Sequence, residues 1–180
     1  MAGVPDHDGN APAIQSAKIE ALYQDAILAH YRKPRNKGSL PGATARAHIA
    51  NPTCGDEVTV EVIVDSGIVR DVRFTGQGCS IAQASASMMT ELAKGASIGA
   101  VRRTAAALER LLRRQPVTRD ALGELIAFEA VARYPARINC VLMPWQALGE
   151  ALGEPLGGSP GATPDERELR DGEHDDTVPA

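Results

Sequence analysis

Four side chains in this sequence could together hold a metal ion: Cys54, Asp56, Cys79 and Cys140. They lie in the segments NPTCGDE, GQGCSIA and PARINCV, at expected boundaries between elements and outside any apolar stripe. Three cysteines cannot all pair within one chain, and in a reducing compartment such thiols are metal ligands or reactive groups more often than disulfides. Three thiolates and one carboxylate suit Zn²⁺, which accepts sulfur and oxygen ligands in a tetrahedral arrangement.

The composition of this ligand set indicates a site that can open. A carboxylate is a harder and more exchangeable ligand than a fourth thiolate, so Asp56 favours an openable site over a purely structural clamp. Cys79 is expected at a helix N-terminus, where the helix dipole and free N–H groups favour a thiolate. Arg137, three residues before Cys140, could stabilise an anionic sulfur atom.

Each of these residues also has a plainer interpretation. A lone cysteine near a strand is usually a small buried apolar residue, and Arg137 could be a solvated surface residue. A buried turn would also explain Gly55 and Asp56. The spacing C-x-D followed by two single cysteines is less specific than paired C-x-x-C motifs. The residues alone therefore leave both interpretations open.

Alternation of apolar and polar residues predicts an antiparallel hairpin in the middle of the chain. In EVTVEVIVD, residues 57–65, apolar residues occupy every second position, as is typical of a half-buried strand. A short turn leads into IVRDVRFT, residues 68–75, and residues 44–50 could add a third strand. The core-facing residues expected on the second strand are Ile68, Val72 and Phe74.

Helical spacing of apolar residues predicts helices on both sides of these strands. The first covers residues 17–31 and ends before Pro34. Four more follow the hairpin, the first of them with Ser80 as N-cap and Gly95 as its stop. Pro144, in the last one, is tolerated only in the first turn or at a kink. The predicted ranges are 80–94, with an apolar stripe of Ile81, Ala84, Met88 and Leu92, then 97–114, 119–132 and 138–152.

This order of elements indicates an α+β fold, in which helices cover a small antiparallel sheet of about three strands. The hairpin would bring Cys54 and Cys79 to one end of the sheet. The last helix could add Cys140 if its N-terminus packs there. Residues two apart in an extended segment point the same way, so Cys54 and Asp56 could serve one ion.

Charge and composition predict that the folded domain covers residues 17–152. The chain has 180 residues and a formal net charge of -4, and residues 153–180 hold eight acidic and two basic residues among many glycines and prolines. We expect this acidic tail and the N-terminal extension 1–16 to be disordered, because neither has much to bury. The remaining charge is too weak and too scattered to predict a nucleic-acid partner.

Hydrophobic residues make up 43% of the chain, which is enough for a core of ordinary size. Aromatic residues make up only 3%, so we expect this core to consist mostly of Ala, Val, Leu and Ile. Nothing approaches the roughly 18 consecutive apolar residues of a membrane span. The first residues show neither the basic flank nor the apolar stretch of a secretory signal. We therefore expect a cytoplasmic protein that has no membrane partner.

Three blocks of the sequence resemble motifs of the U-type iron–sulfur cluster assembly proteins. They are NPTCGDEVTVEV, FTGQGCSIAQASASMMTELAKG and PARINCVLMPW, and LYQDAILAHYRKPRNKGSL resembles that family's N-terminal helix and loop. The resemblance covers about residues 20–152. Within the family the chain is most similar to the SufU branch, because Asn139 stands where IscU-type scaffolds carry a histidine directly before the last cysteine.

The resemblance implies a small antiparallel sheet covered by helices, in agreement with the predicted pattern. It implies Zn²⁺ on Cys54, Asp56, Cys79 and Cys140, with Cys54 as the persulfide acceptor and Arg137 beside the site. It also implies a zinc-dependent sulfurtransferase. Such a protein receives persulfide sulfur from a SufS-type, pyridoxal-phosphate-dependent cysteine desulfurase and passes it on to downstream iron–sulfur assembly proteins.

Two other functions compete with sulfur transfer. A scaffold could assemble a [2Fe–2S] cluster on the same ligands, which would make the chain an iron-binding protein, although four cysteines are the usual set. The other competing function is that of an interaction module in which zinc is purely structural. The absence of a His-Cys pair at residues 139–140 favours zinc-dependent transfer over the scaffold.

Overall fold

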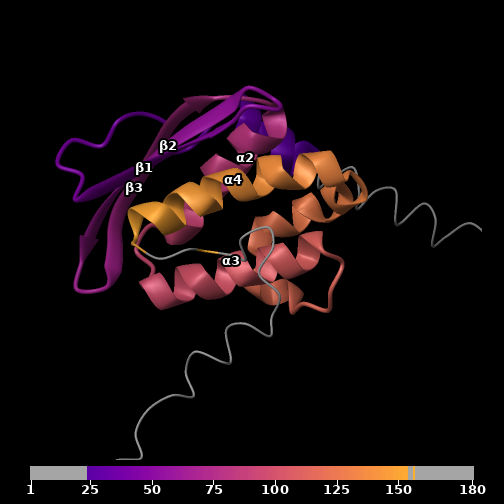
Figure 1. Ribbon diagram of the computed structural model, residues 1–180. Helices are drawn as coiled ribbons and strands as arrows, with labels where there is room; N and C mark the ends of the chain where they lie inside the picture. The colour runs from indigo at the N-terminus through magenta and orange to yellow at the C-terminus, as the bar shows by residue number, and fades with distance from the viewer. Residues whose placement is uncertain (1–23, 154–155, 157–180) are drawn as a thin grey trace, which may run out of the picture.

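The computed structural model describes residues 24–153 and residue 156. Its elements are β1 (Ala45–Asn51), β2 (Asp56–Asp65), β3 (Ile68–Gln77), α2 (Ser80–Ala93), α3 (Ile98–Leu112), the 3-10 segments η1 (Arg119–Ala121) and η2 (Gly123–Arg133), and α4 (Pro135–Ala151). The strands are antiparallel in the order β1–β2–β3. Helices α2 and α4 pack on the sheet, and α3 with η2 forms an outer layer (Figure 1). The predicted α+β fold is confirmed.

Several expectations concern parts of the chain outside the described residues. Residues 24–32 are helical and belong to the predicted first helix, whose earlier part lies outside. The N-terminal extension 1–16 lies outside as well, and so does the acidic tail apart from Gly153 and Leu156. Leu156 is buried against the core. Among the described helices, none is long and apolar enough to cross a membrane.

The β2–β3 hairpin contains a bulge that the sequence pattern did not reveal. Every second residue of β2 is buried along most of its length, as predicted. The pairing with β3 shifts between Ile63 and Val64, and Arg70 has no partner in the ladder. An extra residue reverses which side chains face the core, so Val69 is buried in place of the predicted Ile68.

Helix α2 is buried on almost all sides. Every residue in 82–90 is buried, and the helix packs against both α4 and β3. The predicted apolar stripe is therefore wrong at its ends, where Ile81 is half-buried and Leu92 is exposed. Small Ala and Ser side chains on every face allow this close packing. Gly95, with φ of 82°, follows the helix end as predicted.

The later helices differ from prediction in two places. The segment 119–132 forms two 3-10 segments separated by Leu122, and Gly123, with a φ of 51°, begins the second. Helix α4 begins at Pro135, three residues early, because proline is well suited to a first helical turn. Pro144 lies in the interior of α4 and not in its first turn, so its missing N–H cannot bond the carbonyl of Cys140.

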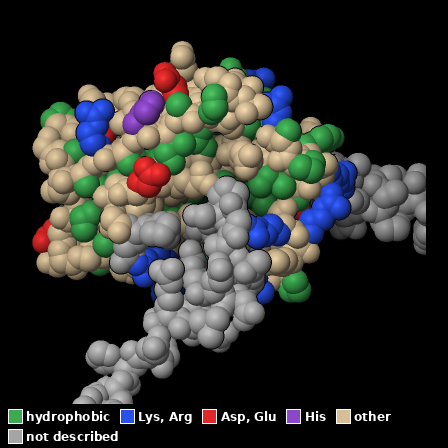
Figure 2. Space-filling model, in the orientation of Figure 1, with side chains coloured by type: hydrophobic (Ala, Val, Ile, Leu, Met, Phe, Trp, Pro, Cys, Tyr) green, Lys and Arg blue, Asp and Glu red, His purple; other side chains and the backbone are tan. Residues whose placement is uncertain are grey.

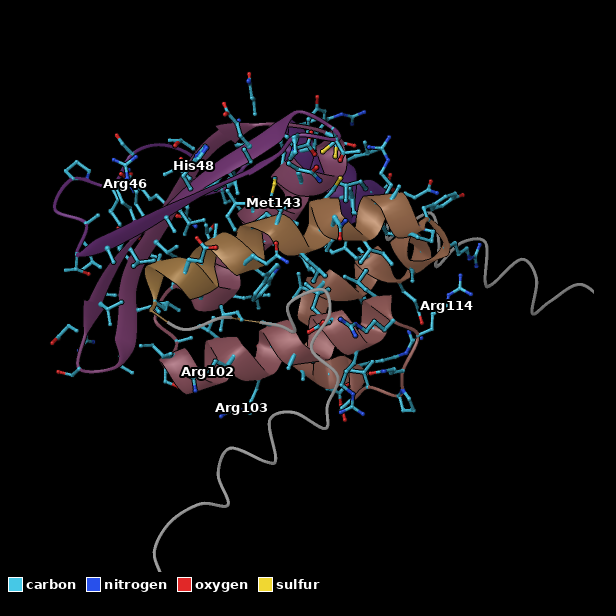
Figure 3. The ribbon with its side chains drawn as sticks, viewed as in Figure 1. Arg46, His48, Arg102, Arg103, Arg114 and Met143 are labelled. Carbon is cyan, nitrogen blue, oxygen red and sulfur yellow. The ribbon has the colours of Figure 1, made fainter. Side chains whose placement is uncertain are left out.

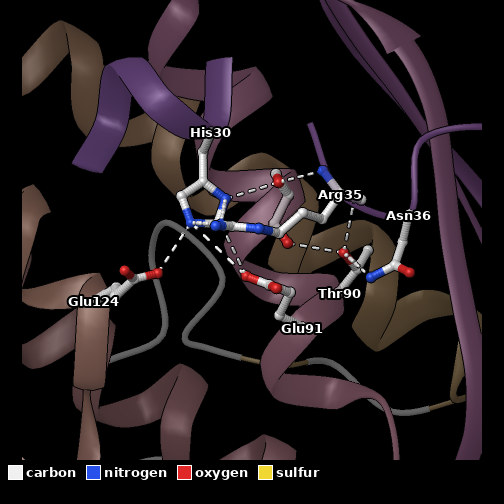
Figure 4. Close-up of polar contacts among 7 residues, drawn as sticks. His30, Arg35, Asn36, Thr90, Glu91 and Glu124 are labelled. Atoms are coloured by element: carbon white, nitrogen blue, oxygen red, sulfur yellow. Dashed lines mark hydrogen bonds and ion pairs between the residues drawn. The ribbon is translucent and has the colours of Figure 1, made fainter. Parts of the chain in front are cut away.

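A buried polar cluster joins the N-terminal helix to α2 and η2 (Figure 4). His30 is 1% exposed and contacts Ser87 Oγ through Nδ1 at 2.8 Å and Glu124 Oε2 through Nε2 at 3.0 Å. Arg35 donates its backbone N–H to the same Ser87 oxygen, and its guanidinium contacts His30 Nε2 and Glu91. Buried polar groups are costly without partners, so these bonds fix where the N-terminal helix lies.

Gly76 permits the close approach of β3 to β2. Its φ is 141°, and a Cβ there would lie 2.2 Å from the backbone oxygen of Glu57. We expect Gly76→Ala to lower the free energy of unfolding by about 2 kcal/mol or more. Chemical denaturation followed by the fluorescence of Trp145, the single and buried tryptophan, measures this.

The matched control is Gly99→Ala in α3. Its Cβ would make an ordinary 3.6 Å contact with Arg103 Nη1. Alanine is also the better helix former, so the stability of this variant should equal or exceed that of the parent protein. Equal unfolding free energies for the two variants would contradict the role of Gly76.

Candidate metal centre

Cys54 lies in the tight turn that joins β1 to β2, and it is exposed. The N–H of Gly55 donates to the carbonyl of Asn51 at 2.9 Å, and Gly55 has a φ of 72°. The expected extended path from Cys54 to Asp56 is therefore wrong, because a left-handed residue turns the chain between them. Asn51 pairs with Asp56 across the ladder, so the turn stays beside the carboxylate.

Asp56 is the buried acid of the site, with 4% of its surface exposed. Its Oδ1 accepts the backbone N–H of Cys79 at 3.0 Å, whereas Oδ2 is buried and has no hydrogen-bond partner. Burial alone would raise the pKa of Asp56. The pKa is nevertheless lowered, because neighbouring donors stabilise the carboxylate. The thiol and the N–H of Cys79 contribute most, followed by the thiols of Cys54 and Cys140.

Cys79 stands where β3 gives way to α2. It is the N-cap residue of α2, a position that the sequence pattern assigned to Ser80. The β2–β3 ladder brings the start of this helix beside Asp56. Gly78 makes the contact possible, because a Cβ there would lie 2.8 Å from Asp56 Cγ. The N–H of Cys79 can therefore reach the carboxylate.

Helix α4 supplies a third thiol and a cation. Arg137 and Cys140 are three residues apart and so lie on one face of the helix. Cys140 is buried, and burial together with the neighbouring Cys79 raises the pKa of its thiol to about 12. Arg137 is exposed, and the neighbouring thiols of Cys140 and Cys79 raise the pKa of its guanidinium. The structure thus places a positive charge against the sulfur atoms.

These elements bring the candidate ligands together at one end of the sheet. One ligand atom from each of Cys54, Asp56 and Cys140 lies within 4.8 Å of the other two. Cys79 is not part of that group at this distance, although it bonds Asp56 and influences Cys140. Cys54 is exposed, Cys79 is half-buried and Cys140 is buried, so the site is open on the Cys54 side.

The donor set fits a divalent metal ion such as zinc. Thiols and a carboxylate are good zinc ligands when deprotonated. The buried Oδ2 of Asp56 lacks the partner that buried polar atoms normally have, and a cation would supply one. The same donors would also accept iron, so this geometry identifies a class of site and leaves the metal to be assigned.

A second group of possible ligands consists of His30, Glu91 and Glu124. The guanidinium of Arg35 lies among them and contacts both His30 and Glu91 (Figure 4). Because this guanidinium already balances the carboxylates, we interpret the group as part of the polar cluster that holds the N-terminal helix.

Sequence reasoning missed an apolar groove beside the thiols. A cavity of about 480 Å³ extends from Arg137 along the N-terminal helix and η2. Its lining includes Leu28, Ile81 and Tyr134, and Tyr134 is exposed. These residues belong to separate elements, so no local pattern in the sequence could have placed them together.

Comparison with known proteins identifies the family. The family model described as the NifU-like N-terminal domain matches residues 22–141. The chain belongs to this family. It is 38% identical over 138 residues to the zinc-dependent sulfurtransferase SufU of Bacillus subtilis, which covers 74% of this chain and 90% of that protein. It is also 36% identical over 140 residues to the iron–sulfur cluster assembly scaffold protein IscU of Streptococcus pyogenes. That match covers 75% of this chain and 85% of the IscU protein.

Solved structures of the NifU-like family share the fold. A protein named as an iron–sulfur cluster assembly scaffold for the SUF system, from Fervidobacterium islandicum, has a TM-score of 0.67 and 31% identity. The match covers 74% of this chain and 98% of that one. The N-terminal part of a NifU-like protein from Brucella abortus gives a TM-score of 0.69 at 27% identity, covering 75% and 94%. The SufU-like resemblance and membership of an iron–sulfur cluster assembly family are confirmed.

Gly78→Ala tests whether Asp56 contributes to metal binding. The added methyl group would displace the carboxylate, and we expect zinc affinity to fall by about tenfold or more. Competition with a chromophoric zinc chelator, using the full chain, measures the affinity. Gly99→Ala, in α3, is the matched control and should bind zinc like the parent protein. Equal affinities for both variants would contradict the role of Asp56.

Proposed function

We propose that this chain is a zinc-dependent sulfur carrier of iron–sulfur cluster assembly. It would accept persulfide sulfur from a SufS-type cysteine desulfurase and pass it to downstream assembly proteins. Family membership and the similarity to a protein named zinc-dependent sulfurtransferase SufU support this function. The observation that carries it is the exposure of Cys54 beside the buried thiol of Cys140 and the buried carboxylate of Asp56.

Cys54, Asp56, Cys79 and Cys140 would hold the zinc ion. When bound, zinc keeps thiols deprotonated at neutral pH and protects them from oxidation. Asp56 would turn its unpaired Oδ2 toward the ion while Oδ1 keeps the Cys79 N–H. The buried Cys140 would stay in place as an anchor, whereas a partner protein can reach the exposed Cys54.

Sulfur transfer would take place at Cys54. Its thiolate attacks the terminal sulfur of the persulfide on the desulfurase, and a new sulfur–sulfur bond forms at Cys54 Sγ. The sulfur–sulfur bond on the desulfurase breaks, and its cysteine leaves as a thiolate. One sulfur atom moves and the exchange has no net oxidation or reduction. The guanidinium of Arg137 lies beside the thiols of Cys140 and Cys79, and from there it would stabilise the anionic persulfide.

A scaffold for a [2Fe–2S] cluster is the second candidate, because relatives at similar identity are named as scaffold proteins. The same four side chains would then bind iron. The residue before Cys140 is Asn139, so the His-Cys pair of IscU-type scaffolds is absent. This difference supports sulfur transfer as the first candidate.

Cys54→Ser tests the assigned acceptor. The hydroxyl is a much weaker nucleophile than a thiolate, so we expect the variant to lose stimulation of a SufS-type desulfurase by about a hundredfold or more. The assay measures alanine release from cysteine at increasing concentrations of this protein. Trp145 fluorescence checks that the variant is folded.

Thr53→Ala is the matched control, since it alters the neighbouring exposed residue of the same turn and leaves the thiol intact. It should stimulate the desulfurase like the parent protein. Full stimulation by folded Cys54→Ser would rule out Cys54 as acceptor, and no stimulation by the parent protein would rule out the carrier function.

A further inference from the structure

The outward face of α3 carries a concentration of positive charge. The segment 102–114 contains five arginines and one glutamate. The arginines are all exposed, and we call them the arginine face: Arg102, Arg103, Arg110, Arg113 and Arg114. At about 100° per residue, Arg103 and Arg110 lie opposite the buried stripe that includes Val101 and Leu108. Arg113 already pairs with Glu109, the one glutamate of this segment.

The arginine face lies on the outer layer of the molecule. Helix α3 packs mainly against η2, and its other side faces away from the sheet (Figure 1). Figure 3 shows Arg102 and Arg103 on this helix and Arg114 just beyond its end. Lys and Arg side chains are also visible over this part of the surface in Figure 2. The metal ligands belong to the β1–β2 turn, the start of α2 and α4, so the arginine face is a separate surface.

The chain carries an oppositely charged segment of its own. Residues 157–180 contain seven acidic and two basic residues. This segment begins directly after Leu156, which is buried in the core and so anchors its start. The first acid, Asp165, is nine residues later, which allows a reach of about 30 Å. Helix α3, with 15 residues, is about 22 Å long, so this reach is longer than the helix that carries most of the arginine face.

We infer that the arginine face is the docking surface for this chain's own acidic segment, residues 157–180. Single exposed ion pairs are weak, but tethering gives the segment a high effective concentration, and many such pairs can form together. The contact is therefore electrostatic and exchangeable, with no single required pair. It neutralises the arginine face and leaves the exposed Cys54 accessible.

NMR of the full, zinc-loaded chain tests this contact. The parent protein is compared with a variant whose seven acids in 157–180 are replaced by Asn or Gln. At about 0.1 M salt, the side-chain Nε–H signals of Arg103 and Arg110 should differ between the two proteins. Near 1 M salt the difference should vanish, because the screening length falls from about 10 Å to about 3 Å. Arg46, exposed on β1, is the internal control and should not change.

A reciprocal variant locates the contact from the other side. This variant is the full chain with three substitutions, Arg103→Glu, Arg110→Glu and Arg114→Glu. The backbone signals of its residues 157–180 should shift to the positions that a free peptide of the same sequence shows. These arginines are exposed, so the fold should persist. Unchanged arginine signals in the first comparison, or equal changes at Arg46, would overturn the inference. The inference would also be overturned if the signals of residues 157–180 were the same in the charge-reversed variant and in the parent protein.

Discussion

A buried carboxylate that needs a partner on each oxygen is the constraint on which the candidate metal centre depends. Asp56 starts β2 inside the protein, where an unpaired charge is costly. The backbone N–H of Cys79 satisfies one oxygen, and this bond requires the start of α2 to lie against the end of the hairpin. Gly78 and Gly76 permit that approach, because side chains at either position would collide with β2. The remaining oxygen faces the thiols.

The packing of the helices decides which thiol is available for chemistry. Helix α2 is buried between its neighbours, and α4 brings Cys140 to the carboxylate and Arg137 to the thiols. Cys140 is thereby enclosed, whereas Cys54 remains in an exposed turn. The candidate ligands thus combine a fixed interior part with an accessible thiol, as the proposed sulfur carrier would require. An apolar groove extends from Arg137 along the N-terminal helix and η2.

Much of this arrangement could be predicted from local patterns. Alternating valines identified β2, and helical spacing identified α3, because one face of each is buried and the other is not. The bulge at Arg70 and the all-round burial of α2 depend on tertiary packing, which no local period records. The residue types of the site were found, and a turn at Gly55 was one of the interpretations left open, but the left-handed conformation of Gly55 and the unpaired Oδ2 were visible only in three dimensions. The family resemblance supplied the expected roles of Cys54 and Arg137.

X-ray absorption spectroscopy of the protein as purified tests the zinc site most directly. Zinc-dependent transfer predicts one zinc per chain with three sulfur neighbours at about 2.3 Å and one oxygen at about 2.0–2.2 Å. In the Asp56→Asn variant the oxygen shell should change while the three sulfur neighbours remain. Iron with bridging sulfide in place of zinc, or zinc with fewer than three sulfur neighbours, would contradict the proposed centre.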